Sequence, residues 1–445
     1  MSTERALRFL TAGSVDDGKS TLIGRLLLDS QALLADQVDT LTQRAAGSPR
    51  DAGGPAFDLS LLTDGLEAER EQGITIDVAW RYFATKQRKF IIADAPGHEQ
   101  YTRNMVTAAA GSDAAVVLVD VTKLDLSSQP LQLLPQTRRH ALLAHLLRVP
   151  SLVFAVNKFD AVPDPGPAFA AVRHALEAFA AEAGMQVAAI VPVSALRGDN
   201  VATPLNASWH VGPSLLQVLE GLPTGRHDTA LGLRLPVQYV ARAGVGSGAR
   251  TGEQPRTLWG RVAQGQVAVG DEVQVFPSGE RARVVALRHV DGEVDAVAAG
   301  LSAGVLLDRP LDVSRGDWLG TPGLLQPVQH VAATLAWLDT DPATPGRRYL
   351  LRHGHRWVQA RLAHVQARLD IHSLRATSAE SLAVNEIGEV VFDLQQPLPL
   401  APFAQNTEAG SLIVVDPTSH RTSGALLVRG DAAVTRAAGA AGAAA

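Results

Sequence analysis

The sequence of 445 residues contains no cysteine. A disulfide framework, a cysteine-ligated zinc or iron–sulfur centre and a thiol nucleophile are therefore excluded. No stretch approaches the roughly 18 apolar residues that a membrane-spanning helix needs, and the N-terminus lacks the basic and apolar segments of a signal peptide. We therefore expect a cytoplasmic protein that has no membrane partner.

Lysine is also scarce, since only five of the 40 basic residues are lysines and none of them follows residue 158. The 45 acidic residues outnumber the basic ones and give a net charge of −5. This balance disfavours a surface that binds nucleic acid. We expect no nucleic-acid partner.

The apolar pattern changes along the chain. Up to about residue 222, short apolar runs alternate with amphipathic stretches, which is typical of a parallel or mixed sheet with helices on both faces. After a linker rich in glycine and proline, valines alternate with polar residues between turn signals, as in small β-barrels. We predict an α/β domain over 1–222, all-β barrels over 230–322 and 328–430, and a disordered Ala/Gly tail over 437–445.

A candidate phosphate-binding loop follows the first predicted strand and opens an amphipathic helix, the context that the pattern G-x-x-x-x-G-K-[ST] requires. The matching residues are Gly13, Ser14, Val15, Asp16, Asp17, Gly18, Lys19, Ser20 and Thr21. Backbone N–H groups and the helix N-terminus would bind a polyphosphate, which Lys19 would also contact. The Ser20 hydroxyl would coordinate Mg²⁺. The alternative is a glycine-rich turn without a ligand.

Two further segments suit the phosphate side of such a site. An apolar strand ends in Asp94, whose carboxylate can hold Mg²⁺ through water, and Gly97 and His98 follow it. The Gly97 amide would reach the terminal phosphate and His98 would orient the attacking water. A charged stretch ends in Gly-Ile-Thr and would place the Thr75 hydroxyl on Mg²⁺ when a γ-phosphate is bound. Taken singly, such residues are more often helix caps or surface residues, but their order after a phosphate loop favours function.

Two strand ends further along the chain suit a guanine base. Asn157, Lys158 and Asp160 follow one apolar strand, and the Asp160 carboxylate can accept two hydrogen bonds that guanine donates and adenine does not. The next strand is followed by Ser194, Ala195 and Leu196, whose backbone N–H groups would contact the guanine oxygen. The order of all these motifs predicts a GTPase.

In these motifs the sequence resembles the translation-factor class of GTPases. Within that class it is most similar to the GTPase subunit (subunit 1, large subunit) of the two-subunit bacterial sulfate adenylyltransferase. The resemblance is densest over 13–27, 62–76 and 88–105. Asp17 separates the subfamilies, because elongation factors read G-H-V-D-H-G-K-[ST] and have histidine there.

The resemblance implies an elongation-factor-Tu-like fold, with GTP and Mg²⁺ as cofactors bound by the residues named above. It implies that GTP hydrolysis drives ATP and sulfate to adenosine 5′-phosphosulfate and pyrophosphate. That reaction would occur on a separate catalytic subunit of sulfate adenylyltransferase, in a heterodimer or a higher hetero-oligomer. The segment 122–135 is longer than the link usual in the family.

Three alternatives remain at this point. A translation factor that delivers aminoacyl-tRNA would have basic barrels, whereas residues 221–445 carry 21 basic and 21 acidic side chains. A bifunctional enzyme that also phosphorylates the phosphosulfate would need a second phosphate-loop lysine, and no lysine follows residue 158. His353, His355 and His364 suggest a metal site, but no acidic or thiol ligand nearby completes it, so ordinary core or surface histidines are favoured.

Overall fold

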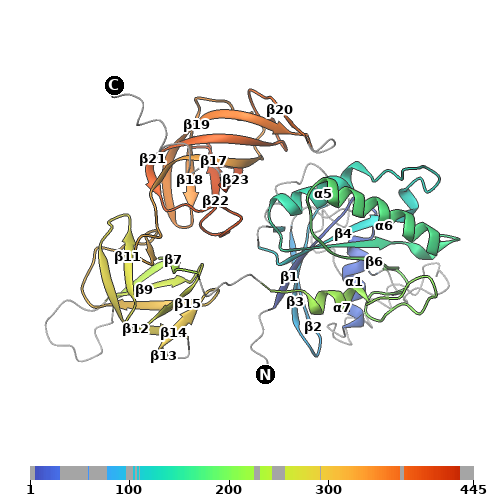
Figure 1. Ribbon diagram of the computed structural model, residues 1–445, viewed down its shortest axis with the longest axis horizontal. Coiled ribbons are helices and arrows are strands. Elements are labelled where there is room, and N and C mark those ends of the chain that lie inside the picture. The colour runs from blue at the N-terminus through green and yellow to red at the C-terminus, as the bar shows by residue number, and fades with distance from the viewer. Residues whose placement is uncertain are drawn as a thin grey trace. The chain divides into compact units, whose positions relative to one another are not determined.

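A computed structural model describes residues 6–30, 59, 78–96, 104–105, 108–109, 111–224, 231–242, 256–290, 292–370 and 375–430 (Figure 1). The chain divides into two compact units at about residue 225. In the described residues the first unit contains helices and a six-stranded sheet. The second unit contains a barrel-like sheet followed by a closed β-barrel.

The first unit is built on a six-stranded sheet with the order β2-β3-β1-β4-β5-β6. Its strands are β1 (Leu7–Ala12), β2 (Ala79–Ala84), β3 (Lys89–Asp94), β4 (Ala114–Asp120), β5 (Ser151–Asn157) and β6 (Val187–Pro192). Strand β2 pairs antiparallel with β3, while the other neighbours pair parallel. The predicted α/β fold class is thus confirmed, with a mixed sheet.

Helices cover both faces of this sheet. They are α1 (Lys19–Asp29), α5 (Pro135–Leu146), α6 (Pro165–Glu182) and α7 (Leu215–Gly221), with short 3-10 turns η3 (Val121–Lys123) and η4 (Phe159–Ala161). Apolar side chains of α1 and α7 pack on one face in a single core cluster, and Figure 1 shows α5 and α6 on the other. Every residue of β4 and β5 is buried, as expected for central parallel strands covered on both sides.

The parallel strands bring the predicted motifs to one edge of the sheet. The carboxyl ends of parallel strands lie at the same edge, which is where ligands bind in open α/β sheets. The phosphate loop follows β1, Asp94 ends β3, and Asn157 ends β5. Ser194 comes shortly after β6.

The second unit begins with a barrel-like sheet in the order β7-β16-β11-β12-β15-β9-β8. A bridge between Arg234 of β7 and Gln264, beyond the end of β9, brings the two sides of this sheet together. The strands of this sheet are β7 (Arg234–Pro236), β8 (Tyr239–Arg242), β9 (Arg256–Arg261), β11 (Glu272–Phe276), β12 (Arg281–His289), β15 (Ser302–Leu307) and β16 (Trp318–Gly320), and β13 (Gly292–Val294) also pairs with β12. Strands β10 (Gln266–Ala268) and β14 (Ala296–Ala298) form a separate two-stranded sheet.

The chain then forms a closed barrel, since β18 pairs with both β22 and β19 and so completes the ring β18-β22-β23-β17-β21-β19. The ring strands are β17 (Val328–Trp337), β18 (Arg348–His353), β19 (Arg356–Leu369), β21 (Ile387–Leu398), β22 (Ser411–Val415) and β23 (Thr422–Val428), and β20 (Ala376–Thr377) pairs with β19 outside the ring. Phe276 and Trp318 of the first barrel pack with Ala401 and Ala409 of the second. The predicted architecture of an α/β domain followed by β-barrels is confirmed.

Candidate functional site

The phosphate loop adopts a backbone conformation that requires glycine. Gly18 caps the start of α1 with φ 90° and ψ 27°, in the left-handed region. A Cβ atom at Gly18 would lie 2.5 Å from the Asn157 side-chain nitrogen. Among the described residues no side chain caps this end of α1, so its first N–H groups are available to an anionic ligand in the loop.

Lys19 points into this loop. Its ammonium donates hydrogen bonds of 2.8 Å to the carbonyls of Gly13 and Ser14, and the residue is only 7% exposed. Burial lowers the pKa of Lys19 from its ordinary value, and the negative charges of Asp94 and Asp17 oppose this effect. The buried Ser14 hydroxyl has no hydrogen-bond partner within the part of the chain that the structure describes. A buried cation beside an unpaired hydroxyl fits a polyphosphate.

The candidate metal ligands lie beside the loop. Asp94 is 2% exposed at the end of β3, and Thr11 donates a hydrogen bond of 3.4 Å to its carboxylate. Ser20 lies in the first turn of α1 and is half-buried. A carboxylate and a hydroxyl are oxygen ligands of the kind that Mg²⁺ prefers. Three other predicted residues, Thr75, Gly97 and His98, lie outside the described residues.

Asn157 joins the phosphate loop to the segment that the sequence predicts to bind guanine. Its side-chain nitrogen donates to the Asp17 carbonyl over 2.9 Å, and its side-chain oxygen accepts from the Ala195 N–H over 2.9 Å. The Lys158 ammonium donates to the Asp16 carbonyl over 2.6 Å. The structure therefore brings residues from 13–21, 157–158 and 194–195 together.

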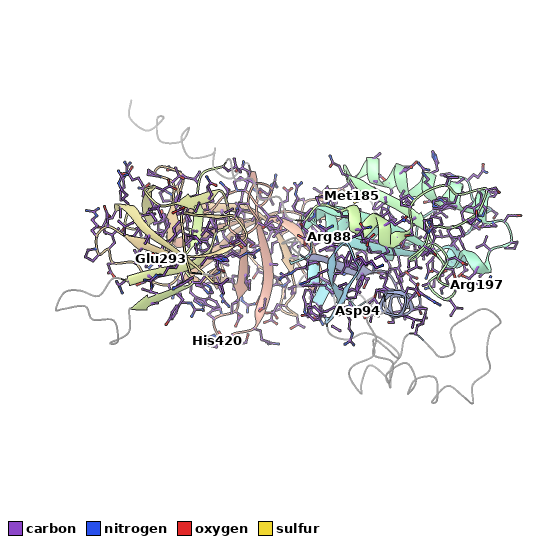
Figure 2. All side chains as sticks on the ribbon, turned by 90° about the horizontal axis from the view of Figure 1, so that it is seen from below. Arg88, Asp94, Met185, Arg197, Glu293 and His420 are labelled. Atoms are coloured by element: carbon purple, nitrogen blue, oxygen red, sulfur yellow. The ribbon has the colours of Figure 1, made fainter. Side chains whose placement is uncertain are left out.

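Asp160 stands at the rim of this group. It lies in the turn η4, and its carboxylate is 15% exposed. One carboxylate oxygen lies 3.8 Å from the Arg197 guanidinium, and the Arg197 N–H donates to the Ser194 hydroxyl over 3.2 Å. Ser194 and Ala195 are buried, whereas Leu196 is exposed. Figure 2 labels Arg197 and Asp94 in this unit.

Two residues that the motifs do not include support the site. Asp120 ends β4 and pairs with the Lys158 ammonium at 2.7 Å. Burial raises the pKa of Asp120, but hydrogen bonds from Lys158 and Thr122 outweigh it and hold that pKa below its ordinary value. Arg25 of α1 donates to the Ala195 carbonyl over 3.3 Å and also to the Leu196 carbonyl. A carboxylate directly after a buried apolar strand was the signal that could have identified Asp120.

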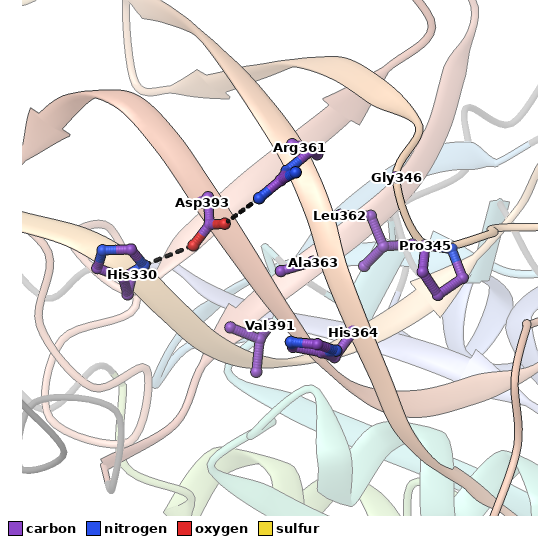
Figure 3. Close-up of a pocket in the computed structure, with 9 residues that line it drawn as sticks. All are labelled: His330, Pro345, Gly346, Arg361, Leu362, Ala363, His364, Val391 and Asp393. Carbon is purple, nitrogen blue, oxygen red and sulfur yellow. Dashed lines mark hydrogen bonds and ion pairs between the residues drawn. The ribbon is translucent and has the colours of Figure 1, made fainter.

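The second barrel carries a cavity of its own, with a volume of about 530 Å³. Figure 3 shows Asp393 between His330 and Arg361, at distances of 2.5 Å and 3.0 Å. None of the nucleotide motif residues that the structure describes lines it. Among the described residues no group of three histidine or acidic side chains is arranged to hold a metal, and His353 instead stacks on Trp318 with ring centroids 5.1 Å apart.

Two family models match this chain. The family model for the elongation factor Tu GTP binding domain matches residues 4–223, and the model described as GTP-eEF1A C-terminal domain-like matches residues 330–429.

Relatives that match nearly the whole chain identify its family more specifically than the two family models do. Sulfate adenylyltransferase subunit 1 of Laribacter hongkongensis is 40% identical over 96% of this chain and 86% of that protein. The bifunctional enzyme NodQ of Azospirillum brasilense is 44% identical over 95% of this chain and 66% of that protein. The bifunctional enzyme CysN/CysC of Mycobacterium tuberculosis is 44% identical over 96% of this chain and 67% of that protein. This chain thus spans about two thirds of the two bifunctional relatives, and it belongs to the sulfate adenylyltransferase subunit 1 family, within the translation-factor class of GTPases.

Proposed function

We propose that this chain binds GTP with Mg²⁺ and that GTP hydrolysis drives the adenylylation of sulfate on a partner catalytic subunit. The products would be adenosine 5′-phosphosulfate and pyrophosphate. The observation that carries the proposal is the convergence on one sheet edge of Lys19, Asn157 and Asp160. The chain's membership of the sulfate adenylyltransferase subunit 1 family connects that edge to sulfate activation.

The phosphates would occupy the loop of residues 13–21. Lys19 now donates to two loop carbonyls, and it would turn its ammonium to the outer phosphates, which are stronger acceptors because they are charged. The Ser14 hydroxyl would gain the partner that it lacks. Ser20 and Asp94 would hold Mg²⁺, which neutralises phosphate charge when bound.

Recognition of the base would depend on Asp160. Its carboxylate would accept the ring N–H and the exocyclic amine of guanine in place of the nearby Arg197 guanidinium. The stem of Lys158 would lie over the ring, while Ala195 and Leu196 would offer N–H groups to the guanine oxygen. The buried position of Ala195 and its bond to Asn157 support this placement.

Hydrolysis and coupling would involve residues beyond those described. We propose that Thr75 and Gly97 respond to the γ-phosphate and that His98 orients the attacking water. A segment ordered by the γ-phosphate can bias a partner's conformation, and such coupling lets an exergonic hydrolysis act on a reaction that is strongly uphill.

A partner is part of the proposal because the relative from Laribacter hongkongensis is named as subunit 1. The catalytic subunit would join this chain in a heterodimer or a larger hetero-oligomer. We also propose a cytoplasmic location, where ATP and GTP are both supplied. Within the described ranges, no helix has the length and apolar character that crossing a bilayer requires. The translation-factor alternative is supported by the shared fold alone.

The test is to co-purify the chain with its cognate catalytic subunit and to measure pyrophosphate release from ATP and sulfate with and without GTP. We expect GTP to stimulate release. Lys19→Ala should abolish GTP binding and stimulation, whereas Lys86→Ala, at an exposed position, should leave both unchanged. His98→Ala should bind GTP normally and slow its single-turnover hydrolysis. Absence of GTP stimulation in the intact complex would refute the proposal.

A further inference from the structure

Three successive carbonyls of the phosphate loop are held by three different side chains. Lys123 donates to the Val15 carbonyl over 2.7 Å, and Lys158 donates to the Asp16 carbonyl over 2.6 Å. The third donor is Asn157, which reaches the next carbonyl over 2.9 Å. Two of these donors belong to the guanine motif, but Lys123 belongs to no motif and lies in η3, after β4.

This arrangement determines which way the loop's N–H groups point. In a trans peptide the C=O and the following N–H point in opposite directions. Because the carbonyls of Val15, Asp16 and Asp17 are each held by a side-chain donor, the direction of the N–H group that follows each of them is fixed as well. One of these groups, the Asp17 N–H, donates a hydrogen bond of 3.3 Å to the Ser14 carbonyl and so closes a turn within the loop. A loop whose peptide groups are held in advance can offer its remaining N–H groups to an anion without first having to be ordered.

Lys123 is also the ion-pair partner of a buried carboxylate. Its ammonium lies 2.8 Å from Asp17, whose side chain is 1% exposed. The other carboxylate oxygen of Asp17 accepts the Ser14 N–H over 2.6 Å. Lys123 therefore acts on the loop twice, directly at the Val15 carbonyl and through Asp17 at Ser14. A charged donor makes both contacts stronger than neutral hydrogen bonds would be.

The same lysine is connected to the guanine side. Its ammonium lies 3.8 Å from the Asp120 carboxylate, which pairs with Lys158 at 2.7 Å. Asp120 thus lies between two lysines that hold neighbouring carbonyls of one loop. Asp17 stands where the elongation-factor motif has histidine, and a histidine offers no negative charge to such a network.

We propose that Lys123 is a positioning residue that, together with Asp17, fixes the phosphate loop for a nucleoside polyphosphate. The proposal rests on the proposed binding of GTP at this loop. Lys123 acts through peptide groups and does not itself touch the nucleotide. Loss of Lys123 should therefore weaken the binding of the phosphates more than the binding of the base.

The decisive variant removes both charges. Lys123→Met alone leaves the Asp17 carboxylate buried without its partner and lowers the stability of the fold. The double variant Asp17→Asn/Lys123→Met avoids this, because asparagine can still accept the Ser14 N–H. Lys123→Arg keeps a charged donor that reaches two acceptors. Lys86→Met, at an exposed position in the turn between β2 and β3, is the matched control.

The measurement is the dissociation rate of fluorescent GDP and GMP from the full chain by displacement. For GDP we expect release to be about tenfold to a hundredfold faster in the double variant, within about threefold of the parent in Lys123→Arg, and unchanged in Lys86→Met. The effect should be smaller for GMP, which lacks the β-phosphate.

The outcomes separate this inference from the proposed function. A parent chain that binds no guanine nucleotide refutes the proposed function. A parent chain that binds GDP, with a double variant that releases it at the parent rate, overturns the role of Lys123. Equal losses for GDP and GMP, together with a lower melting temperature of the nucleotide-free double variant, would show general structural support only and would also overturn it.

Discussion

The side-chain amide of Asn157 donates a hydrogen bond of 2.9 Å to the main-chain carbonyl of Asp17. Because Asn157 is 2% exposed, this bond is made away from water and connects the end of β5 to the phosphate loop. The same side chain accepts the Ala195 N–H. Its loss would leave a buried carbonyl and a buried N–H without partners, which costs more than the bonds themselves contribute.

Asn157→Ala should therefore weaken both the phosphate loop and the segment around Ala195, because it removes a hydrogen bond to each. We expect the affinity for GDP to fall by about tenfold to a hundredfold, the equivalent of one or two such losses. Titration calorimetry on the purified chain would measure it. Asn206→Ala, at an exposed position, is the matched control and should bind as the parent does. Equal affinities for parent and Asn157→Ala would contradict the bridging role.

Gly18→Ala tests the close approach between the loop and Asn157. Alanine at φ 90° is strained, and its Cβ would lie 2.5 Å from the Asn157 side-chain nitrogen. Gly184 has φ 65°, and no atom of the described residues lies within 4 Å of a Cβ built there, so Gly184→Ala introduces the backbone strain without a steric clash. Both variants should lose about 1 kcal/mol of stability from the backbone alone.

Only Gly18→Ala should also lower the affinity for GDP, by at least about tenfold, because the Asn157 side chain must move away from the new Cβ atom. Denaturant unfolding and GDP titration of both variants would separate the two effects. If Gly184→Ala weakened GDP binding as strongly, backbone strain rather than the contact with Asn157 would explain the loss.

The sequence pattern predicted the central strands well because they are buried on both faces. Such strands read as continuous apolar runs, and β4 and β5 are buried throughout. Strand β2 was not predicted. It is an edge strand in which exposed side chains such as Tyr82 alternate with more buried ones, and its antiparallel pairing with β3 makes the sheet mixed.

The candidate site was predictable where function fixes a spacing within one short segment. The loop of residues 13–21 and the group at 157–160 are of this kind. Lys123 pairs with Asp17 across 106 residues, and Arg25 reaches Ala195 across 170. Neither pair has a fixed spacing, and each depends on parallel strands that bring distant segments to one sheet edge, so neither could be predicted from the sequence.

Asp160→Asn should change which base the site prefers. The carboxylate can accept two hydrogen bonds from guanine, whereas an amide offers one acceptor and one donor group and so suits the additional carbonyl of xanthine. We expect affinity for GDP to fall by about a hundredfold or more and affinity for xanthosine diphosphate to rise.

Competition between the two nucleotides for a fluorescent probe would measure the change. Asp164→Asn is the matched control, because Asp164 is exposed and makes no cap hydrogen bond at the start of α6. A preference for guanine that survives Asp160→Asn would assign base recognition to another residue.

His353 should make the stability of the second unit depend on pH. It is fully buried against Trp318. Burial lowers the pKa of His353 from 6.5 to about 4, because it outweighs the opposing effect of hydrogen bonding to the backbone of Ala409 and Glu408, and the Arg234 charge makes a smaller lowering contribution. Below pH 6.5 the unfolded chain therefore binds a proton that the folded chain does not, and stability is lost as the pH falls from about 6.5 to 4.

The loss attributable to this one group should approach about 3 kcal/mol at pH 4. His353→Phe keeps an aromatic ring in the stack with Trp318 but cannot be protonated, so it should remove that part of the pH dependence. His364→Phe, at an exposed position in the same barrel, should leave it in place. Urea unfolding followed by tryptophan fluorescence at pH 7, 5.5 and 4 would compare the three proteins. Other groups titrate in all three proteins, so the informative quantity is the difference between them in how the free energy of unfolding changes with pH. If the parent and His353→Phe lost the same free energy of unfolding between pH 7 and pH 4, His353 would not be the source of the pH dependence.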